Sequence, residues 1–293
     1  MDLNSAAIKL EPFLKNGANL DFSKAVPRCL NLKATPSIKA NARYFDTPEW
    51  TSQYLRYCHR DEAFKARWTA AVGSLDGKVV VDIGCGPGNV FATLGGKPKA
   101  LIGVDVSAGA LEIARKAGYE PLVADAHDLP LASGIADIVI VNATIHHCDD
   151  MAGVLREAAR LVAPGGILVT DHDPQLGAWN FKGPGLWLWK LRLHIYAWTK
   201  KGFHRSPTEQ ACALASEIHH RPGDGVTREF FESVLIPFGF KVELYPHNHL
   251  AGIDALSHHG RAKFKYRIGQ LLSGINPNSP DAALSLMCRA SRA

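Results

Sequence analysis

The 293-residue sequence lacks any C-x-x-C pair, and its six cysteines are scattered along the chain. With 46% hydrophobic residues, a chain of this length fills an ordinary core and does not need disulfides for stability. We therefore interpret the cysteines as reduced thiols and expect a cytoplasmic protein.

A long uninterrupted hydrophobic run is also missing. The most apolar stretch, GLWLWKLRLHIYAW (185–198), contains Lys190, Arg192 and His194, so it could not span a bilayer without burying charge. The N-terminus has no basic segment followed by a sustained apolar one, so we expect no signal peptide.

Basic residues never occur in a run longer than two, yet the charge is unevenly distributed. Residues 1–173 carry 18 basic and 20 acidic side chains, a net charge of −2, and residues 174–293 carry 15 and 8, a net charge of +7. An anionic partner such as a membrane surface, a nucleic acid or an acidic substrate would explain this asymmetry. A solvated basic surface explains it equally simply, and we favour that interpretation.

Short runs of Val and Ile alternate with amphipathic segments in the middle of the chain. This pattern is typical of a parallel sheet with helices on both faces, so we predict an α/β fold with a doubly wound, mostly parallel, seven-stranded sheet. Ser107 is placed to cap one helix, Gly118 to end it, and Pro164-Gly165-Gly166 to form a turn. The expected strands are 78–84, 100–107, 121–126, 137–144, 167–173, 240–247 and 283–291, with helices from Asp150 and over 227–239.

Four regions follow from this pattern. The first is an N-terminal extension and helical lid, irregular over 1–40 and helical from Thr47 to about Leu75. It covers residues 1–76. A cofactor-binding α/β core follows at 77–173, and an aromatic and basic lid insertion at 174–226. A C-terminal part at 227–293 completes the sheet and contains a further insertion at 250–280.

The first strand of the core runs into a glycine-rich loop, VVVDIGCGPGNV (79–90). A dinucleotide fingerprint would place a small residue where Asn89 stands, and no Gly-Lys-Ser/Thr follows for a Walker loop. Asp82 would repel a pyrophosphate by roughly 1–4 kcal/mol but would attract a cationic amine or sulfonium. The loop therefore favours a ligand with a positive head.

Two further acids follow the next strands. Asp105 ends the second strand, where an acid can accept hydrogen bonds from both ribose hydroxyls. Asp125 and Ala126 end the third strand, where a polar tip beside a small residue suits an adenine edge.

The motifs VVVDIGCGPG, GVDVS, ADAHDLP, ADIVIVNATIHHCDD and LREAARLVAPGG occur in one order over residues 79–173. Together they resemble the class I S-adenosylmethionine-dependent methyltransferases, and are most similar to the small-molecule branch that includes the quinone-biosynthesis enzymes. The resemblance implies S-adenosylmethionine as the cofactor. The resemblance also implies how the cofactor lies. Its methionine part would lie over Gly84, Gly86 and Gly88, with Asp82 at the ammonium group and Asn142 beside it. Asp105 would hold the ribose, and the adenine would contact Val106, Asp125 and Ala126.

Three histidines are candidate general bases. His146 and His147 follow the fourth strand and His172 follows the fifth, so all three are expected near the methyl group. The alternative is that they pack in the loops and bond backbone groups, since alignment alone supplies much of the rate of a methyl transfer. Adjacent histidines point to different faces, so we predict no metal site.

The stretch KGPGLWLWKLRLHIYAWTKKGFHR (182–205) combines aromatic and basic residues. We expect a lid helix over a small apolar or aromatic acceptor, or a helix resting on a membrane surface; simple packing onto the core is the alternative. A nucleic-acid substrate is not favoured, because no N/D-P-P-Y/F/W motif follows the fourth strand.

We therefore predict an enzyme that transfers a methyl group to a small molecule by in-line displacement. Two alternatives stay open at this point: a nicotinamide-dependent oxidoreductase on a similar sheet, and a non-catalytic protein that binds S-adenosylmethionine. The sequence does not indicate an oligomeric state.

Overall fold

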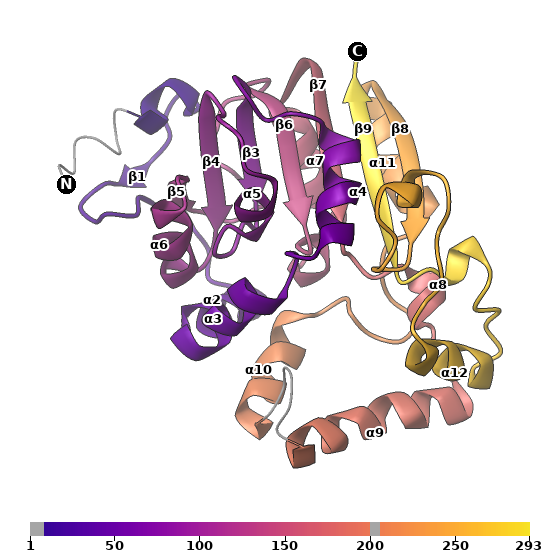
Figure 1. Cartoon of the computed structure of the whole chain (residues 1–293). Helices are drawn as coiled ribbons and strands as arrows, with labels where there is room; N and C mark the ends of the chain where they lie inside the picture. The colour runs from indigo at the N-terminus through magenta and orange to yellow at the C-terminus, as the bar shows by residue number, and fades with distance from the viewer. Residues whose placement is uncertain (1–8, 200–205) are drawn as a thin grey trace.

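One mixed sheet organises the chain in the computed structural model, which describes residues 9–199 and 206–293 (Figure 1). The strand order is β1-β2-β5-β4-β3-β6-β7-β9-β8. The central strands from β5 to β7 are parallel, and β9 pairs antiparallel with both β7 and β8. The strands are β1 (Leu20–Asp21), β2 (Arg28–Cys29), β3 (Val79–Ile83), β4 (Ala100–Asp105), β5 (Glu120–Val123), β6 (Ala136–Asn142), β7 (Val162–Asp171), β8 (Phe240–His247) and β9 (Ser285–Arg292).

Helices cover both faces of this sheet, so the prediction of a doubly wound α/β fold is confirmed. Ser107 accepts a hydrogen bond from the backbone of Ala110 and Asp150 one from Gly153, so both cap helices as expected. The helices are α2 (Pro36–Asp46), α3 (Pro48–Tyr57), α4 (Glu62–Val72), α5 (Asn89–Leu94), α6 (Ala108–Lys116), α7 (Met151–Leu161), α8 (Leu176–Trp179), α9 (Gly183–Thr199), α10 (Pro207–Ser216), α11 (Arg228–Leu235) and α12 (Phe264–Leu272).

Four local predictions are corrected. Two short strands, β1 and β2, extend the predicted seven to nine by pairing at the β5 edge, and α2 begins inside the stretch predicted as irregular. The helical pattern after Thr47 divides into α3 and α4, because the Asp61 side chain caps a new helix at Phe64 N–H. Pro164-Gly165-Gly166 lies within β7, where a register shift against β6 accommodates it.

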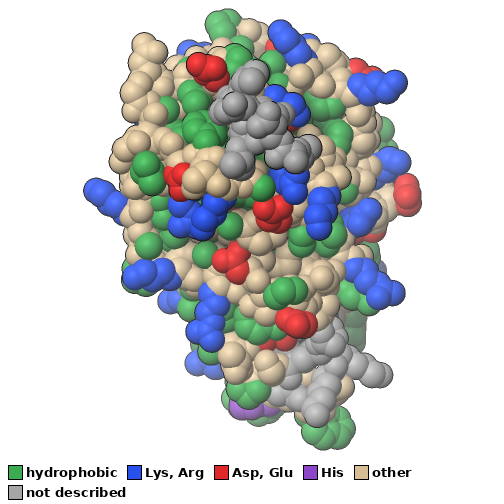
Figure 2. Space-filling view, turned by 90° about the vertical axis from the view of Figure 1, so that its left-hand side faces the viewer, with side chains coloured by type: hydrophobic (Ala, Val, Ile, Leu, Met, Phe, Trp, Pro, Cys, Tyr) green, Lys and Arg blue, Asp and Glu red, His purple; other side chains and the backbone are tan. Residues whose placement is uncertain are grey.

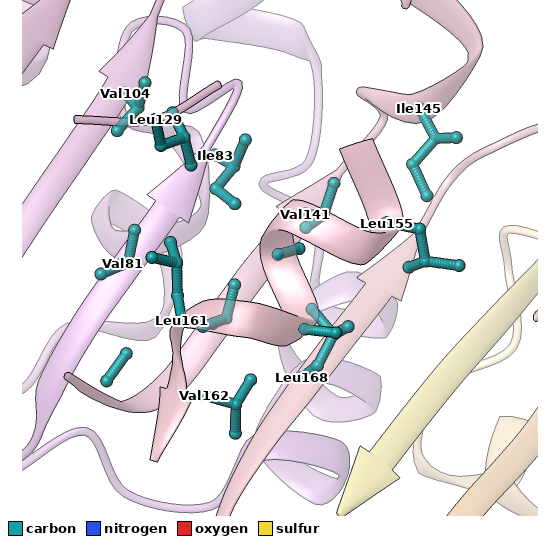
Figure 3. Packing of buried hydrophobic residues seen from close by; sticks show 14 of the residues in the cluster. Val81, Ile83, Val104, Leu129, Val141, Ile145, Leu155, Leu161, Val162 and Leu168 are labelled. Carbon is teal, nitrogen blue, oxygen red and sulfur yellow. The ribbon is translucent and has the colours of Figure 1, made fainter. Parts of the chain in front are cut away.

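Two hydrophobic layers hold the helices against the sheet. On one face, Leu155 and Leu161 of α7 pack against strand residues such as Val81, Val141 and Leu168 (Figure 3). On the other face, Phe64 and Trp68 of α4 and the apolar side of α6 pack against β3, β4 and β6. All seven of these named side chains are almost fully buried, so the sheet is a rigid support for the loops at its carboxyl edge.

The carboxyl edge is covered by helices from distant parts of the chain. The helices α2 and α3 lie beneath it on one side, and α10, α9 and α12 form a layer farther below (Figure 1). The predicted lid helix is α9, and the remaining residues of that stretch, 200–205, lie outside the described part. This arrangement encloses the sheet edge where ligands of α/β folds bind.

No helix in the described residues is long and apolar enough to cross a membrane. Trp187 and Trp198 on α9 are 66% and 84% exposed, and contact with a membrane surface through them stays a prediction. On the face shown in Figure 2, Lys and Arg side chains are dispersed among Asp and Glu rather than gathered into a stripe.

Candidate active site

The loop between β3 and α5 carries three glycines in conformations that other residues rarely adopt. Gly84, Gly86 and Gly88 have φ values of 68°, 52° and 88°. A Cβ on Gly84 would lie 2.3 Å from Thr144 and one on Gly88 2.8 Å from the Tyr119 ring, whereas one on Gly86 would meet no atom within 4 Å. Gly84 and Gly86 line a cavity at the sheet edge; Gly88 precedes α5 and serves packing instead.

Asp82 lines the same cavity and is 1% exposed. Its Oδ2 accepts a hydrogen bond of 2.7 Å from the Tyr119 hydroxyl, and its Oδ1 has no hydrogen-bond partner among the described residues. Burial raises the pKa of Asp82 to about 7, although the Tyr119 hydrogen bond favours the carboxylate. A cationic group in the cavity would supply the missing partner.

Asp105 ties the end of β4 to the glycine loop. Its Oδ2 accepts from the Gly86 N–H at 2.9 Å and its Oδ1 from the Ser107 N–H at 2.8 Å. Burial raises the pKa of Asp105 to about 6, although these backbone hydrogen bonds favour the ionised carboxylate. Each oxygen keeps a lone pair for a further donor, so the carboxylate can both shape the loop and bind a hydroxyl.

Val106, Asp125 and Ala126 line the cavity beyond β4 and β5. The Asp125 carboxylate accepts hydrogen bonds from the ring and the backbone N–H of His127, at 2.6 Å and 3.0 Å. Burial opposes ionisation of Asp125, but these hydrogen bonds outweigh it and hold its pKa below the ordinary value. Sequence reasoning missed His127, although it stands two residues after a predicted site residue.

Asn142, at the end of β6, is 6% exposed and also lines the cavity. Its side-chain oxygen has no hydrogen-bond partner in the described part of the chain. The next residue, Ala143, has φ 51°, a left-handed conformation that is strained for a residue with a Cβ. Such strain concentrates at functional sites, and here it turns the chain sharply below the cavity.

The N-terminal helices line the other side of this cavity; the sequence predicted a helical lid in this region but not which of its residues reach the cavity. Their positions depend on packing between segments more than thirty residues apart, which no local pattern reveals. Asn41, for example, bonds the His147 carbonyl oxygen at 3.4 Å. The lining residues from α2 and α3 are Ser37, Ile38, Asn41, Phe45 and Tyr54.

The three candidate bases lie in different surroundings. His147 lines the cavity, and its Nδ1 is 3.0 Å from the Ser216 carbonyl oxygen, which fixes Nδ1 as the donor and Nε2 as an acceptor. His146 bonds Asp173 at 2.8 Å through Nδ1 and does not line the described cavities. Burial lowers the pKa of both His146 and His147 to about 3, so both are neutral at physiological pH.

His172 lies away from the cavity, in a buried polar network centred on Asp171. Asp171 accepts from Arg67 Nε and Trp68 Nε1 at 3.1 Å each, and from His247 Nε2 at 2.6 Å. Burial opposes ionisation of Asp171, but these neighbours hold its pKa well below the ordinary value. The network therefore joins α4 to β7 and β8 and stabilises the packing of these elements.

A second, smaller cavity adjoins the first, and we call it the passage. Phe45, Tyr54 and His147 line both, and Glu217 also lines the passage. Glu217 bonds the His220 ring at 3.0 Å. Burial opposes its ionisation, but His220, His147 and His146 outweigh it and hold the pKa of Glu217 well below the ordinary value.

Glu217 also lines a chamber of about 790 Å³, to which His220 contributes as well. Aromatic and aliphatic side chains of α8, α9 and α12 form most of its wall. Sequence reasoning expected the aromatic residues of α9 here but left the roles of Glu217 and His220 open. The aromatic lining residues are Trp179, Phe181, Trp189, Tyr196, Phe264 and Tyr266.

Residues 81–170 match the model of a protein family described as a methyltransferase domain. These residues therefore resemble a methyltransferase domain. The chain is 33% identical over 115 residues to the ubiquinone biosynthesis O-methyltransferase of Thiobacillus denitrificans, a match covering 37% of this chain and 50% of that protein. It is 39% identical over 93 residues to a tRNA (carboxymethyluridine(34)-5-O)-methyltransferase of Mus musculus, covering 31% of this chain and 14% of that protein.

The chain thus spans half the length, or less, of these two curated relatives. Among solved structures, the chain resembles the geranyl diphosphate C-methyltransferase of Streptomyces coelicolor A3(2), with a TM-score of 0.52. The match covers 89% of this chain and 99% of that one at 14% identity, so it supports the shared fold alone.

The groups that line the cavity suit S-adenosylmethionine. The unpartnered Oδ1 of Asp82 suits an ammonium group, and the unpartnered oxygen of Asn142 suits a second donor. The open space beside Gly86 leaves room for the chain of the ligand. Among the residues described, no group of three or more His, Cys, Asp or Glu side chains could hold a metal ion.

Proposed function

We propose that this chain transfers a methyl group from S-adenosylmethionine to a small, apolar or aromatic acceptor. The observation that carries the proposal is that shared lining residues, His147 and Glu217 among them, link the cofactor cavity, the passage and the aromatic chamber. The cavity would hold the cofactor through Asp82, Asp105 and Asn142. The chamber would hold the acceptor.

In this proposal each of the four predicted regions has a different role. The core over 77–173 binds the cofactor, while α2 and α3 from the N-terminal region and α9 and α10 from the insertion act as the lid. The C-terminal region completes the sheet and contributes α12 to the chamber. Since all six cysteines are unpaired, we propose the cytoplasm as the place of action.

S-adenosylmethionine, held by Asp82, Asp105 and Asn142, would supply an electrophilic methyl group and would leave as a neutral thioether. The protein aligns the acceptor with that methyl group. His147 Nε2 accepts the proton that the acceptor loses, since Nδ1 already donates to Ser216. Glu217, ionised beside His220, orients the acceptor at the mouth of the chamber.

A small molecule suits the chamber better than a nucleic acid does. The wall is mainly apolar, and the visible basic side chains of Figure 2 form no continuous stripe. The similarity to the tRNA methyltransferase of Mus musculus covers only 31% of this chain and 14% of that protein. We therefore place the acceptor among small apolar or aromatic compounds.

Two measurements on the full chain test the proposal. By isothermal titration, we expect S-adenosylhomocysteine to bind and NAD(P) not to bind, because Asp82 disfavours a pyrophosphate. With S-adenosylmethionine labelled on its methyl group, we expect label to appear in small molecules of a cell extract. Tight NAD(P) binding without a response to S-adenosylhomocysteine would favour an oxidoreductase; cofactor binding with no labelled acceptor would favour a non-catalytic binding protein.

His147→Gln should lower the single-turnover rate at saturating cofactor by about 10²- to 10⁴-fold, the usual contribution of a positioned base. The acceptor is the compound labelled in the preceding assay. His146→Gln and His172→Gln are the comparison variants, because neither residue lines the cavity, and we expect much smaller changes in them. Equal rates for wild type and His147→Gln would show that alignment alone carries the reaction.

A further inference from the structure

The aromatic wall of the chamber is a connected stack of rings. The Trp179 and Trp189 rings lie 5.1 Å apart between centroids, and Phe181 lies 5.3 Å from Trp189. Tyr266 of α12 lies 5.6 Å from Trp179. Because the rings support one another across α8, α9 and α12, this wall presents a firm apolar surface to a flat ligand.

One cation is held in this wall. The guanidinium carbon of Arg192 lies 3.2 Å from the centroid of the Trp189 ring, and Nη1 donates to the Trp189 carbonyl oxygen at 2.5 Å. Within the described residues, Arg192 makes no ion pair with a carboxylate. Burial lowers the pKa of Arg192 to about 10, so the side chain keeps its charge at neutral pH.

Stacking on one ring face and one backbone hydrogen bond leave most of the guanidinium donors unused. A partly buried charge without a counter-ion is costly, and a planar guanidinium pairs best with a planar carboxylate through two parallel hydrogen bonds. Glu217 lines the same chamber and its charge favours the protonated form of Arg192, but its carboxylate bonds His220 and makes no ion pair with Arg192 among the described residues. The counter-ion is therefore expected to come with the ligand.

We infer that the chamber selects an aromatic acceptor that carries a carboxylate, and that Arg192 binds this carboxylate. The inference rests on the proposed function for the acceptor's location. It adds the charge of the acceptor and names Arg192 as a specificity-determining residue. Lys265 also lines the chamber, but it is exposed, with its Nζ 4.8 Å from the Tyr266 ring, and we assign it no such role.

The test compares two probes of nearly equal shape, 3-hydroxy-2-naphthoate and its neutral methyl ester. Binding of each is measured by isothermal titration to the full chain saturated with S-adenosylhomocysteine. In the wild type, we expect the acid to bind at least about tenfold more tightly than the ester. Arg192→Gln should remove this preference, Arg192→Lys should keep part of it, and Lys265→Gln should leave it unchanged.

The affinity of each variant for S-adenosylhomocysteine shows whether the fold and the cofactor cavity are intact. Equal affinities of the wild type for acid and ester, no binding of either probe, or an undiminished preference in Arg192→Gln would each overturn the inference and leave the cofactor proposal standing. Failure of the wild type to bind S-adenosylhomocysteine would overturn the proposed function itself.

Discussion

Arg67→Met is expected to lower the free energy of unfolding by about 3–5 kcal/mol, the largest effect on stability that the structure predicts. Arg67 and Asp171 are both fully buried, and their side chains are joined by the Nε–Oδ2 contact of 3.1 Å. Methionine fills a similar volume but leaves the Asp171 carboxylate buried without its cation. Because the substitution leaves a buried carboxylate without its cation, the loss of unfolding free energy exceeds the net contribution of the ion pair to stability.

The measurement is urea unfolding of the full chain, followed by circular dichroism at neutral pH. Arg228→Met is the matched control, because Arg228 pairs with Glu232 at 3.3 Å on an exposed helix face, where the loss should not exceed about 0.5 kcal/mol. Trp68 and His247 also donate to Asp171. A loss of unfolding free energy below about 1 kcal/mol in Arg67→Met would therefore mean that these two donors stabilise the buried carboxylate without Arg67.

Asp82→Asn is expected to weaken binding of S-adenosylhomocysteine by about 30- to 150-fold, which corresponds to about 2–3 kcal/mol for a charged hydrogen bond. The unpartnered Oδ1 of Asp82 is the atom that we expect to accept from the ligand's ammonium group. Asparagine keeps the size and an acceptor for the Tyr119 hydroxyl, but it removes the charge. Isothermal titration at pH 7.5 measures the difference.

The same carboxylate makes binding depend on pH. With a pKa of about 7 in the ligand-free protein, Asp82 is mostly protonated at pH 5.5, so its protonation alone should lower wild-type affinity roughly 20-fold between pH 7.5 and 5.5. Asp105, with a pKa of about 6, should leave a few-fold dependence in Asp82→Asn. An equally steep dependence in both proteins would assign the effect to another group.

The stability of the ligand-free protein should change in the opposite direction. Because the pKa of Asp82 is raised on folding, the folded state holds the proton more strongly, and this contribution is lost as pH rises from about 4 through 7. A bound ammonium group offsets the buried charge. The increase in melting temperature caused by S-adenosylhomocysteine should therefore be larger at pH 7.5 than at pH 5.5.

Tyr119→Phe distinguishes the contribution of the Asp82 charge to ligand binding from the contribution of its position. It removes the hydroxyl that donates to Asp82 Oδ2 at 2.7 Å but keeps the carboxylate and the ring that packs on Gly88. We expect a smaller loss of affinity at neutral pH than in Asp82→Asn, since only the hydrogen bond that favours the ionised form is gone. A loss as large as that in Asp82→Asn would show that position matters as much as charge.

The chemistry of the cofactor side was largely predictable from local sequence. Strands buried on both faces appear as continuous Val and Ile runs, and the side chains at their carboxyl ends must meet at one edge in a parallel sheet. For this reason Asp82, Asp105, Asp125 and Asn142 line one cavity. Gly88 is the exception, because its contact with Tyr119 arises from the packing of α5 against α6 and β5.

The acceptor side was predictable only in composition. The density of Trp and Tyr after β7 indicated an apolar lid, since such residues rarely remain unburied without a partner. The sequence could not show that Arg192 stacks on Trp189 without a carboxylate partner, or that Glu217 lines both the passage and the chamber. Those contacts join α9, α12 and the segment after α10, which are distant along the chain.

The sequence by itself determined the fold class, the cofactor family and the charge that the glycine loop prefers, because all three depend on short-range periodicity and adjacent residues. Only the tertiary structure decided which histidine reaches the cavity, that α2 and α3 close it, and that Asp171 and His172 belong to a buried network. Such assignments depend on which distant segments pack together, and the packing of a whole chain is not contained in any local pattern.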